Sequence, residues 1–173
     1  MTLKATSSLL LSLLLAGPVQ ASDFDFDVPM HLKGASTFYI SGRVGDMPPS
    51  DFMVDTGSSY MTINEETLAL LQQTENPVYL RDLTGILANG DQMRVPVYAV
   101  SSVQLGEGCR LDEVEVAVFP GKTRQILGLS VLLKAAPFVF STDPPQLQLS
   151  NCGLAETKNG DQTVLAADTG THE

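Results

Sequence analysis

The stretch Phe52-Met53-Val54-Asp55-Thr56-Gly57-Ser58-Ser59 contains the residues that decide the fold. Its three apolar residues are typical of a buried strand, and that strand runs directly into Asp55. Gly57 permits a sharp turn behind the aspartate, because glycine has no Cβ to clash with the backbone. The pattern therefore predicts a carboxylate held at the end of a rigid element. The Asp-Thr-Gly tripeptide alone is a weak signal, since turns rich in these residues are common.

Short strands are predicted on both sides of this stretch. Runs of β-branched and aromatic residues bounded by Gly, Pro or Asn are typical of strands. We expect them at residues 37–40, 51–54, 60–63, 78–86, 92–100, 113–118, 138–140 and 146–149. Many short strands with frequent turns predict a mainly β fold, closed into a small single-lobed barrel.

Two short helices complete the expected elements. Asn64 is a good N-cap, and the acidic residues Glu65 and Glu66 after it suit the first turn of a helix over residues 65–73. The apolar run at 129–136 predicts the second helix. Between the helices, Asn89-Gly90 is a strong hairpin signal that joins strands 78–86 and 92–100. We expect this hairpin to project from the barrel.

The N-terminus has the order of a secretory signal peptide. Lys4 precedes a short apolar run over residues 9–16, and Val19-Gln20-Ala21 places small residues before a cut after Ala21. The apolar run is too short for a transmembrane anchor, which needs about 18 residues. We therefore expect residues 1–21 to be removed on export to the periplasm or the extracellular space.

The remaining chain has the length of one domain, which we place at residues 36–152. Residues 22–35 are acidic and form either an edge strand or a flexible arm. Residues 153–173 are polar and are predicted to be a disordered tail. The net charge of −10 argues against nucleic acid as a partner.

The two cysteines, Cys109 and Cys152, suggest one disulfide, because an even count in an exported protein is typical of such a bond. Two unrelated buried thiols are the alternative. Neither cysteine has a histidine near it in sequence, so the pattern favours neither a zinc site nor a thiol protease, and we expect no metal or cofactor.

Three features together resemble the retropepsin-like aspartic peptidases, and within them the small exported bacterial members with one lobe. These features are the stretch 52–59, the hairpin tip Leu87-Ala88-Asn89-Gly90, and Ile126-Leu127-Gly128 with the helix after it. The resemblance covers residues 36–151. A motif combined with its expected strand context is far stronger than the motif alone.

The resemblance implies a role for each matching residue. Asp55 would be the catalytic carboxylate, Thr56 would hydrogen-bond across a dimer axis, and Ser58 would hydrogen-bond the outer oxygen of Asp55. Gly57 would allow the turn. The flap that closes over a polypeptide substrate would consist of Gly85, Ile86, Leu87, Ala88, Asn89, Gly90 and Asp91. Structural support under the loop would come from Ile126, Leu127 and Gly128.

One chain supplies one such loop, and this predicts a homodimer. Asp168-Thr169-Gly170 is a second copy of the tripeptide, but too few residues follow it to build a strand, a helix and a supporting Leu-Gly element. Two copies of Asp55 related by a two-fold axis are the simplest source of a pair of carboxylates. Carboxylates about 3 Å apart share one proton, so one member can act as base and the other as acid on a bound water. Activity should favour acidic pH.

Two other classes of function remain open. A monomeric domain of the same fold could be a binding module of the cell envelope without activity, because fold does not dictate function. A serine hydrolase would use Ser58 or Ser59 beside Asp55, but it needs a base. His31 and His172 lie near the two ends of the chain, so a triad would require those ends to reach the centre.

Overall fold

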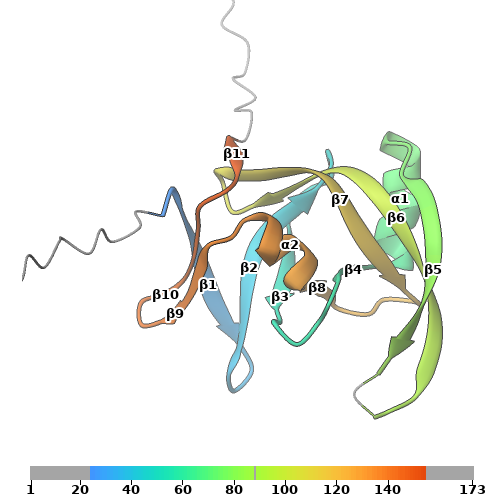
Figure 1. The fold of residues 1–173 in the computed structure, drawn as a ribbon, viewed down its shortest axis with the longest axis horizontal. Helices are drawn as coiled ribbons and strands as arrows, with labels where there is room; N and C mark the ends of the chain where they lie inside the picture. The colour runs from blue at the N-terminus through green and yellow to red at the C-terminus, as the bar shows by residue number, and fades with distance from the viewer. Residues whose placement is uncertain (1–23, 88, 155–173) are drawn as a thin grey trace, which may run out of the picture.

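The structure, a computed structural model, describes residues 24–87 and 89–154 (Figure 1). The strands are β1 (Phe26–Lys33), β2 (Thr37–Val44), β3 (Ser50–Val54), β4 (Met61–Asn64), β5 (Val78–Ile86), β6 (Gln92–Leu105), β7 (Cys109–Phe119), β8 (Gln125–Leu127), β9 (Phe138–Thr142), β10 (Pro145–Leu149) and β11 (Gly153–Leu154). The helices are α1 (Glu65–Thr74) and α2 (Leu129–Lys134). The predicted mainly β fold with two short helices is confirmed.

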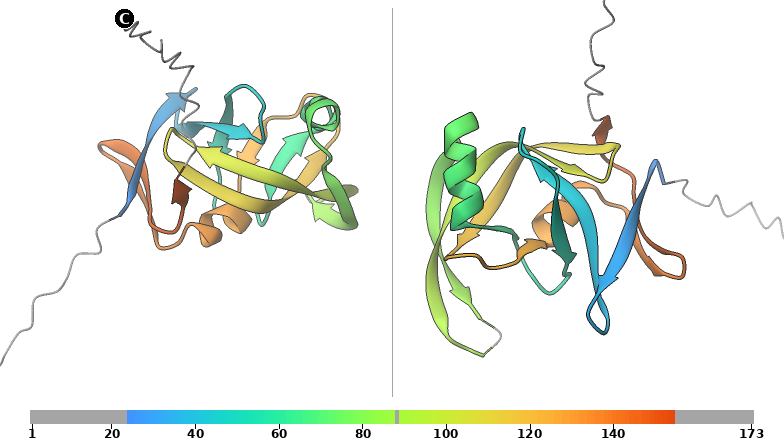
Figure 2. Two further views of the ribbon diagram at one scale, coloured as in Figure 1. Left: turned by 90° about the horizontal axis from the view of Figure 1, so that it is seen from above. Right: turned by 180° about the vertical axis from the view of Figure 1, so that it is seen from behind.

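The strands pair in one continuous sheet that closes on itself. Its order is β5-β6-β7-β4-β8-β3-β2-β1-β10-β9, and an additional β2–β6 pairing joins two strands that are distant in this order. The long strand β6 therefore pairs with β5, β7 and β2. This pairing closes a ring through β7, β4, β8 and β3, and two views of the ribbon show the curved strands around it (Figure 2).

The core fills this ring and the space under both helices. Its largest fully buried side chains include Phe52 of β3, Ile63 of β4, Leu105 of β6 and Leu127 of β8. Both helices contact β4 and β7, and α1 adds Leu71 to the core. The strand that leads to Asp55 and the strand that supports it are thus both anchored in the same buried cluster.

Helix α1 begins at Glu65, as predicted, and ends at Thr74, one residue after the predicted end. The side chain of Asn64 accepts a hydrogen bond from the backbone N–H of Thr67 at 2.9 Å, which satisfies one free donor of the first turn. Glu65 and Glu66 lie where the positive end of the helix dipole favours negative charge. At the other end, the backbone N–H of Glu75 donates to the carbonyl of Leu71.

The N-terminal segment is neither the edge strand nor the flexible arm that we expected at residues 22–35. Strand β1 pairs with β10 over Phe26 to Pro29 and with β2 over Met30 to Lys33, so it lies between two strands of the sheet. Val28 and Met30 are buried. The reason is that the apolar side chains at alternate positions face the core while the acidic residues face outward. The domain, which we predicted to begin at residue 36, therefore also includes residues 26–33.

The C-terminal end of the domain also reaches further than expected. Gly153 and Leu154, predicted to begin the polar tail, form β11 and pair with the start of β7. The predicted disulfide between Cys109 and Cys152 is confirmed, with a Cα–Cα distance of 5.0 Å. The bond holds the chain beside β7 and so explains this pairing.

Several expectations lie outside the described residues. They are the signal peptide at residues 1–21, the tail from residue 155 onward, the second Asp-Thr-Gly tripeptide at 168–170, and Ala88 in the flap. Within residues 24–87 and 89–154, neither helix has the length and apolar character that a membrane crossing requires.

Candidate active site

Asp55 follows the last residue of β3 and is fixed by the backbone around it. Its N–H donates to the carbonyl of Leu127 at 3.1 Å, which continues the parallel pairing of β3 with β8. Its carboxylate oxygen Oδ1 accepts the backbone N–H of Gly57 at 2.9 Å. The side chain of Asp55 is partly exposed. The predicted arrangement of a carboxylate presented at the end of a rigid strand is therefore what the fold produces.

Ile126, Leu127 and Gly128 lie against the Asp55 loop, which comprises residues 55–60. Leu127 is fully buried. The backbone N–H of Leu129 donates to the carbonyl of Ser58 at 2.8 Å, and that of Ser130 donates to the carbonyl of Ser59 at 3.0 Å. The start of α2 thus holds the second half of the loop by main-chain hydrogen bonds.

Gly128 is required by this close approach of two backbones. A Cβ at this position would lie 2.2 Å from the carbonyl oxygen of Tyr60 and 2.9 Å from that of Ser58. Both contacts involve backbone atoms, which cannot move aside as a flexible side chain can. The hydrophobic-hydrophobic-glycine element is therefore shaped to fit under the loop.

The loop residues Thr56 and Ser58 differ in their surroundings. Thr56 is exposed at the tip of the turn. The hydroxyl of Ser58 donates to the carbonyl of Tyr60 at 2.8 Å. The predicted hydrogen bond from Ser58 to Asp55 is wrong for this structure, because the turn brings the backbone N–H of Gly57 to the carboxylate while Ser58 points along the chain toward Tyr60.

The hairpin of β5 and β6 extends beyond the rest of the sheet, as predicted (Figure 1). At its tip, the N–H of Leu87 donates to the carbonyl of Asp91, and the N–H of Gly90 donates to the carbonyl of Leu87, both at 2.8 Å. Gly90 has a φ of +87°, a conformation that glycine adopts readily. Ile86 is 74% exposed on this hairpin.

The Asp55 loop and the hairpin border one cavity of about 380 Å³, which we call the flap cavity. It is lined by Gly57, Ser58, Ser59, Tyr60, Thr62, Leu83, Thr84, Gly85, Ile86, Val95, Ala117 and Phe119. Most of these side chains are apolar or small, as is common in a site that binds an apolar group. The lining includes Gly57, whose backbone N–H binds the Asp55 carboxylate, so the loop that holds this carboxylate is part of the cavity wall.

A family model described as aspartyl protease matches residues 40–131 of the chain. The matched range includes the Asp55 loop, the β5–β6 hairpin and the supporting residues 126–128. The chain belongs to the aspartyl protease family.

The fold of this aspartyl protease is similar to the crystal structure of a retropepsin-like aspartic protease from Rickettsia conorii. The TM-score is 0.51 and the sequence identity is 23%, over 76% of this chain and 92% of that chain. This similarity agrees with the resemblance that the sequence motifs indicated. A comparison with curated proteins gave no significant match.

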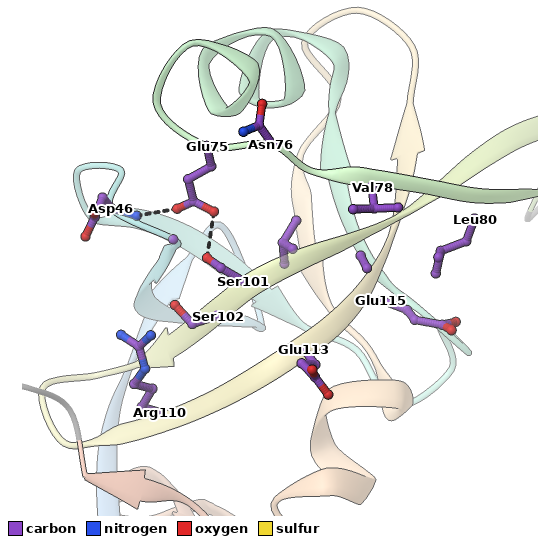
Figure 3. A pocket seen from close by; sticks show the side chains of 13 residues that line it. Asp46, Glu75, Asn76, Val78, Leu80, Ser101, Ser102, Arg110, Glu113 and Glu115 are labelled. Atoms are coloured by element: carbon purple, nitrogen blue, oxygen red, sulfur yellow. Dashed lines mark hydrogen bonds between the residues drawn. The ribbon is translucent and has the colours of Figure 1, made fainter.

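A second cavity of about 740 Å³ is larger than the flap cavity but contains no residue of the Asp55 loop or of the flap (Figure 3). In its wall, the carboxylate of Glu75 accepts hydrogen bonds from the backbone N–H of Asp46 at 2.8 Å and from the hydroxyl of Ser101 at 2.6 Å. These contacts join the end of α1 to the turn after β2 and to β6. Because no residue of the Asp55 loop lines this cavity, its greater volume does not make it the candidate active site.

The structure adds residues to the site that the sequence analysis treated only as parts of strands. Tyr60 and Thr62 line the flap cavity from the segment after the Asp55 loop, and Leu83 lines it from β5. A signal for the first two was available, since Tyr60 and Thr62 stand two residues apart and so point to one side of an extended segment. Leu83 could not be placed without knowing how β5 pairs.

The described residues hold no group of three or more His, Cys, Asp or Glu side chains that could bind a metal ion. His31 lies beside Asp51, with Nε2 at 3.4 Å from a carboxylate oxygen. Lys33 pairs with the same carboxylate. This histidine is therefore engaged at the start of β3 rather than at the loop where β3 ends.

Proposed function

We propose that this chain is an aspartic endopeptidase that hydrolyses polypeptides through two copies of Asp55, one from each subunit of a homodimer. The observation that carries the proposal is the carboxylate of Asp55, which is fixed at the end of β3 by the backbone N–H of Gly57, a residue that lines the flap cavity. Family membership supports the same chemistry.

The mechanism that we propose follows from the repulsion between two nearby carboxylates. At a separation of about 3 Å both cannot be ionised, so the pair holds one proton over a wide pH range. The ionised member removes a proton from a water bound between them, and the resulting oxygen attacks the peptide carbonyl. The protonated member supports the oxyanion that develops. The C–N bond then breaks, and a proton from the pair passes to the leaving amine.

The neighbours of Asp55 in the loop, the flap and the supporting residues would each contribute to this mechanism. The N–H of Gly57 donates to Asp55 and fixes its orientation before substrate binds. Thr56, exposed at the tip of the turn, is available to contact the same loop of a second copy. Residues 85–91 would cover the bound peptide as a flap. Ile126, Leu127 and Gly128 would support the loop without touching substrate.

We also propose export to the periplasm or the extracellular space. The expected signal peptide at residues 1–21 is one support, and the disulfide between Cys109 and Cys152 is the other, because such bonds persist mainly in oxidising compartments.

A serine hydrolase is not supported by the described residues. The hydroxyl of Ser58 donates a hydrogen bond to the backbone carbonyl of Tyr60, and His31 pairs with Asp51 rather than with a serine.

The test compares peptide cleavage at acidic pH by the native chain, by Asp55→Asn and by the control Asp51→Asn. Asp51 lies on the same strand but its carboxylate pairs with Lys33. We expect Asp55→Asn to lose at least about 10³-fold in kcat/KM, the scale of a lost acid–base group, while Asp51→Asn stays active. Cleavage by the native chain should also be inhibited by pepstatin.

Sedimentation measures the oligomeric state and so tests the proposed homodimer. We expect the native chain to form dimers at the concentrations where it cleaves peptides. A binding module would instead remain monomeric, cleave no peptide at acid pH and be indifferent to Asp55→Asn. Either a persistent monomer in the presence of ligand or full activity of Asp55→Asn would contradict the proposed function.

A further inference from the structure

A β-bulge in β5 turns Arg81 toward the face of the sheet that carries the flap cavity. Tyr79 is opposite Tyr98 of β6, and Arg81 is opposite Val97, so the register shifts between these two pairs. Tyr98 and Val97 are adjacent and face opposite sides of the sheet. Without the shift Arg81 would share the side of Tyr79, because residues two apart on a regular strand face the same way. A bulge is a common means of redirecting a side chain near a site.

From this position Arg81 reaches across the middle strand to Glu115 of β7. Val97 and Ala99 of β6 are opposite Ala117 and Glu115 of β7, so all of these side chains lie on one face. The guanidinium of Arg81 makes two hydrogen bonds to the Glu115 carboxylate, at 3.2 and 2.5 Å. A two-pronged contact of this kind fixes the plane of the guanidinium as well as its place.

Each member of the Arg81–Glu115 pair favours the charged form of the other. The hydrogen bonds from Arg81 lower the pKa of Glu115, although burial opposes the shift. The hydrogen bond to Glu115 in turn raises the pKa of Arg81. Glu115 therefore stays ionised in more acidic solution than an ordinary glutamate, and this is the range in which the proposed acid–base pair works.

The same guanidinium donates a hydrogen bond to the hydroxyl of Tyr60 at 3.1 Å. The ring of Tyr60 packs against the cluster of Val95, Val97 and Ala117, and it lines the flap cavity. Tyr60 also follows directly after the serines of the Asp55 loop. Its ring is thus held at both ends, by the backbone of the loop on one side and by Arg81 on the other.

We infer that Arg81 and Glu115 are positioning residues that hold Tyr60 as a wall of the substrate-binding cavity, and that this wall restricts the size of the substrate side chain that enters. The inference rests on the proposed function. A tyrosine ring fixed through its hydroxyl cannot swing out to admit a larger group. When the hydroxyl contact is lost, the ring can turn about its Cα–Cβ bond and the cavity can widen.

The test uses Tyr60→Phe, Arg81→Met and the double variant of the full chain. Tyr60→Phe removes one hydroxyl and keeps the ring, so it tests the contact with the smallest risk to folding. The matched control is Arg110→Met, because Arg110 also pairs with a carboxylate, that of Asp112, but lies away from the flap cavity. Substrates are peptides in which each position around the cleaved bond carries Ala, Val, Leu or Phe in turn.

We expect the ratio of kcat/KM for Phe over Ala at one peptide position to rise about tenfold in Tyr60→Phe and in Arg81→Met, the scale set by small changes in an apolar pocket. The double variant should show the same ratio as either single variant, because both remove one shared contact. Arg110→Met should keep the native ratio. Unchanged ratios in Tyr60→Phe and Arg81→Met, in enzymes that cleave peptides, would overturn the inference and leave the proposed function intact.

Calorimetry measures the binding of statine-containing peptides that carry the same substitutions. These affinities distinguish a failure of the inference from a failure of the proposed function when the native chain cleaves no peptide. If the native chain cleaves nothing but binds these peptides, and the variants shift the Phe over Ala affinity ratio, the inference holds and the proposed function fails. If the native chain neither cleaves nor binds any of these peptides, both are overturned.

Discussion

The Asp55 loop and the β5–β6 hairpin border the same cavity, but the loop and the tip of the hairpin are held in different ways. The loop is joined to residues far away in sequence, since Asp55 bonds to Leu127 and Ser58 bonds to Leu129. Among the described residues, the hydrogen bonds of the flap tip stay within 87 and 89–91, including the contact of the Asp91 N–H with the Asn89 side chain at 3.1 Å. One region depends on the whole fold, whereas the other depends on its own turn.

This difference suggests that the loop and the flap tip have different roles in activity. A loop that bonds to the strand and helix under it can move only if the core opens, so it keeps its carboxylate oriented before substrate arrives. A hairpin tip with local bonds can open and close at little cost to the rest of the domain. The comparison thus predicts that changes at the loop affect stability and activity together, while changes at the tip affect activity alone.

The largest effect is expected from Gly128→Ala. The new Cβ would lie 2.2 Å from the Tyr60 carbonyl, so the loop and α2 must move apart. We expect a loss of about 3 kcal/mol in the free energy of unfolding, the upper range for overpacking. Peptide cleavage should fall at least about 100-fold, because the carboxylate is displaced. Urea unfolding and steady-state kinetics measure the two effects.

Gly85→Ala is the control on the flap side of the cavity for the stability measurement. A Cβ at Gly85 would meet its nearest atoms at 3.7 Å, an ordinary contact, so the unfolding free energy should change by less than about 0.5 kcal/mol. If both alanine variants unfold at the same urea concentration as the native chain, the close contact under the loop has no energetic importance and the comparison fails.

The sequence predicts the loop and the hairpin well because each signal is local. The apolar run before Asp55, the glycines and the Asn89-Gly90 pair all act through neighbouring residues. The helix at 65–73 is found at Glu65–Thr74 for the same reason, since Asn64 caps it directly. The disulfide is predicted from the number of cysteines rather than from the geometry.

The features that the sequence did not predict depend on pairing between distant segments. The segment at residues 22–35, expected to be an edge strand or a flexible arm, contains Pro29, and proline cannot donate to a sheet. It is tolerated in β1 at the point where pairing changes from β10 to β2. Arg81 is directed to the cavity face by a bulge that simple alternation cannot reveal. The partner of Ser58 depends on how the chain turns toward Tyr60.

A smaller effect is expected from Gly90→Ala at the flap tip. The φ of +87° at Gly90 is unfavourable for alanine by about 1 kcal/mol, although no heavy atom lies within 4 Å of the added Cβ. We expect kcat/KM to fall about fivefold, the equivalent of that energy, with little change in urea unfolding because the tip can open separately. The prediction fails if Gly90→Ala lowers the free energy of global unfolding by the full amount of about 1 kcal/mol and leaves kcat/KM unchanged. That result would show that the tip unfolds together with the core.

The smallest effect concerns the base of the flap, where Arg81 and Glu115 link β5 to β7 over a long distance in sequence. The pKa of Glu115 is lowered by Arg81 from its ordinary value of 4.5, so folding favours the ionised carboxylate. The pair therefore adds stability above pH 4.5, and this stability is lost as the pH falls through the lowered pKa of the folded state.

Melting temperatures of the native chain, Glu115→Gln and Arg81→Met between neutral and strongly acidic pH measure this contribution. We expect both variants to melt about 2 °C lower than the native chain at neutral pH, the scale of a partly exposed ion pair, and the differences to vanish in strong acid. Lys134 also favours the charged carboxylate, so a larger loss in Glu115→Gln than in Arg81→Met at neutral pH would assign part of the effect to Lys134. Differences that are constant over the whole pH range would mean that packing, rather than charge, joins the base of the flap to the sheet.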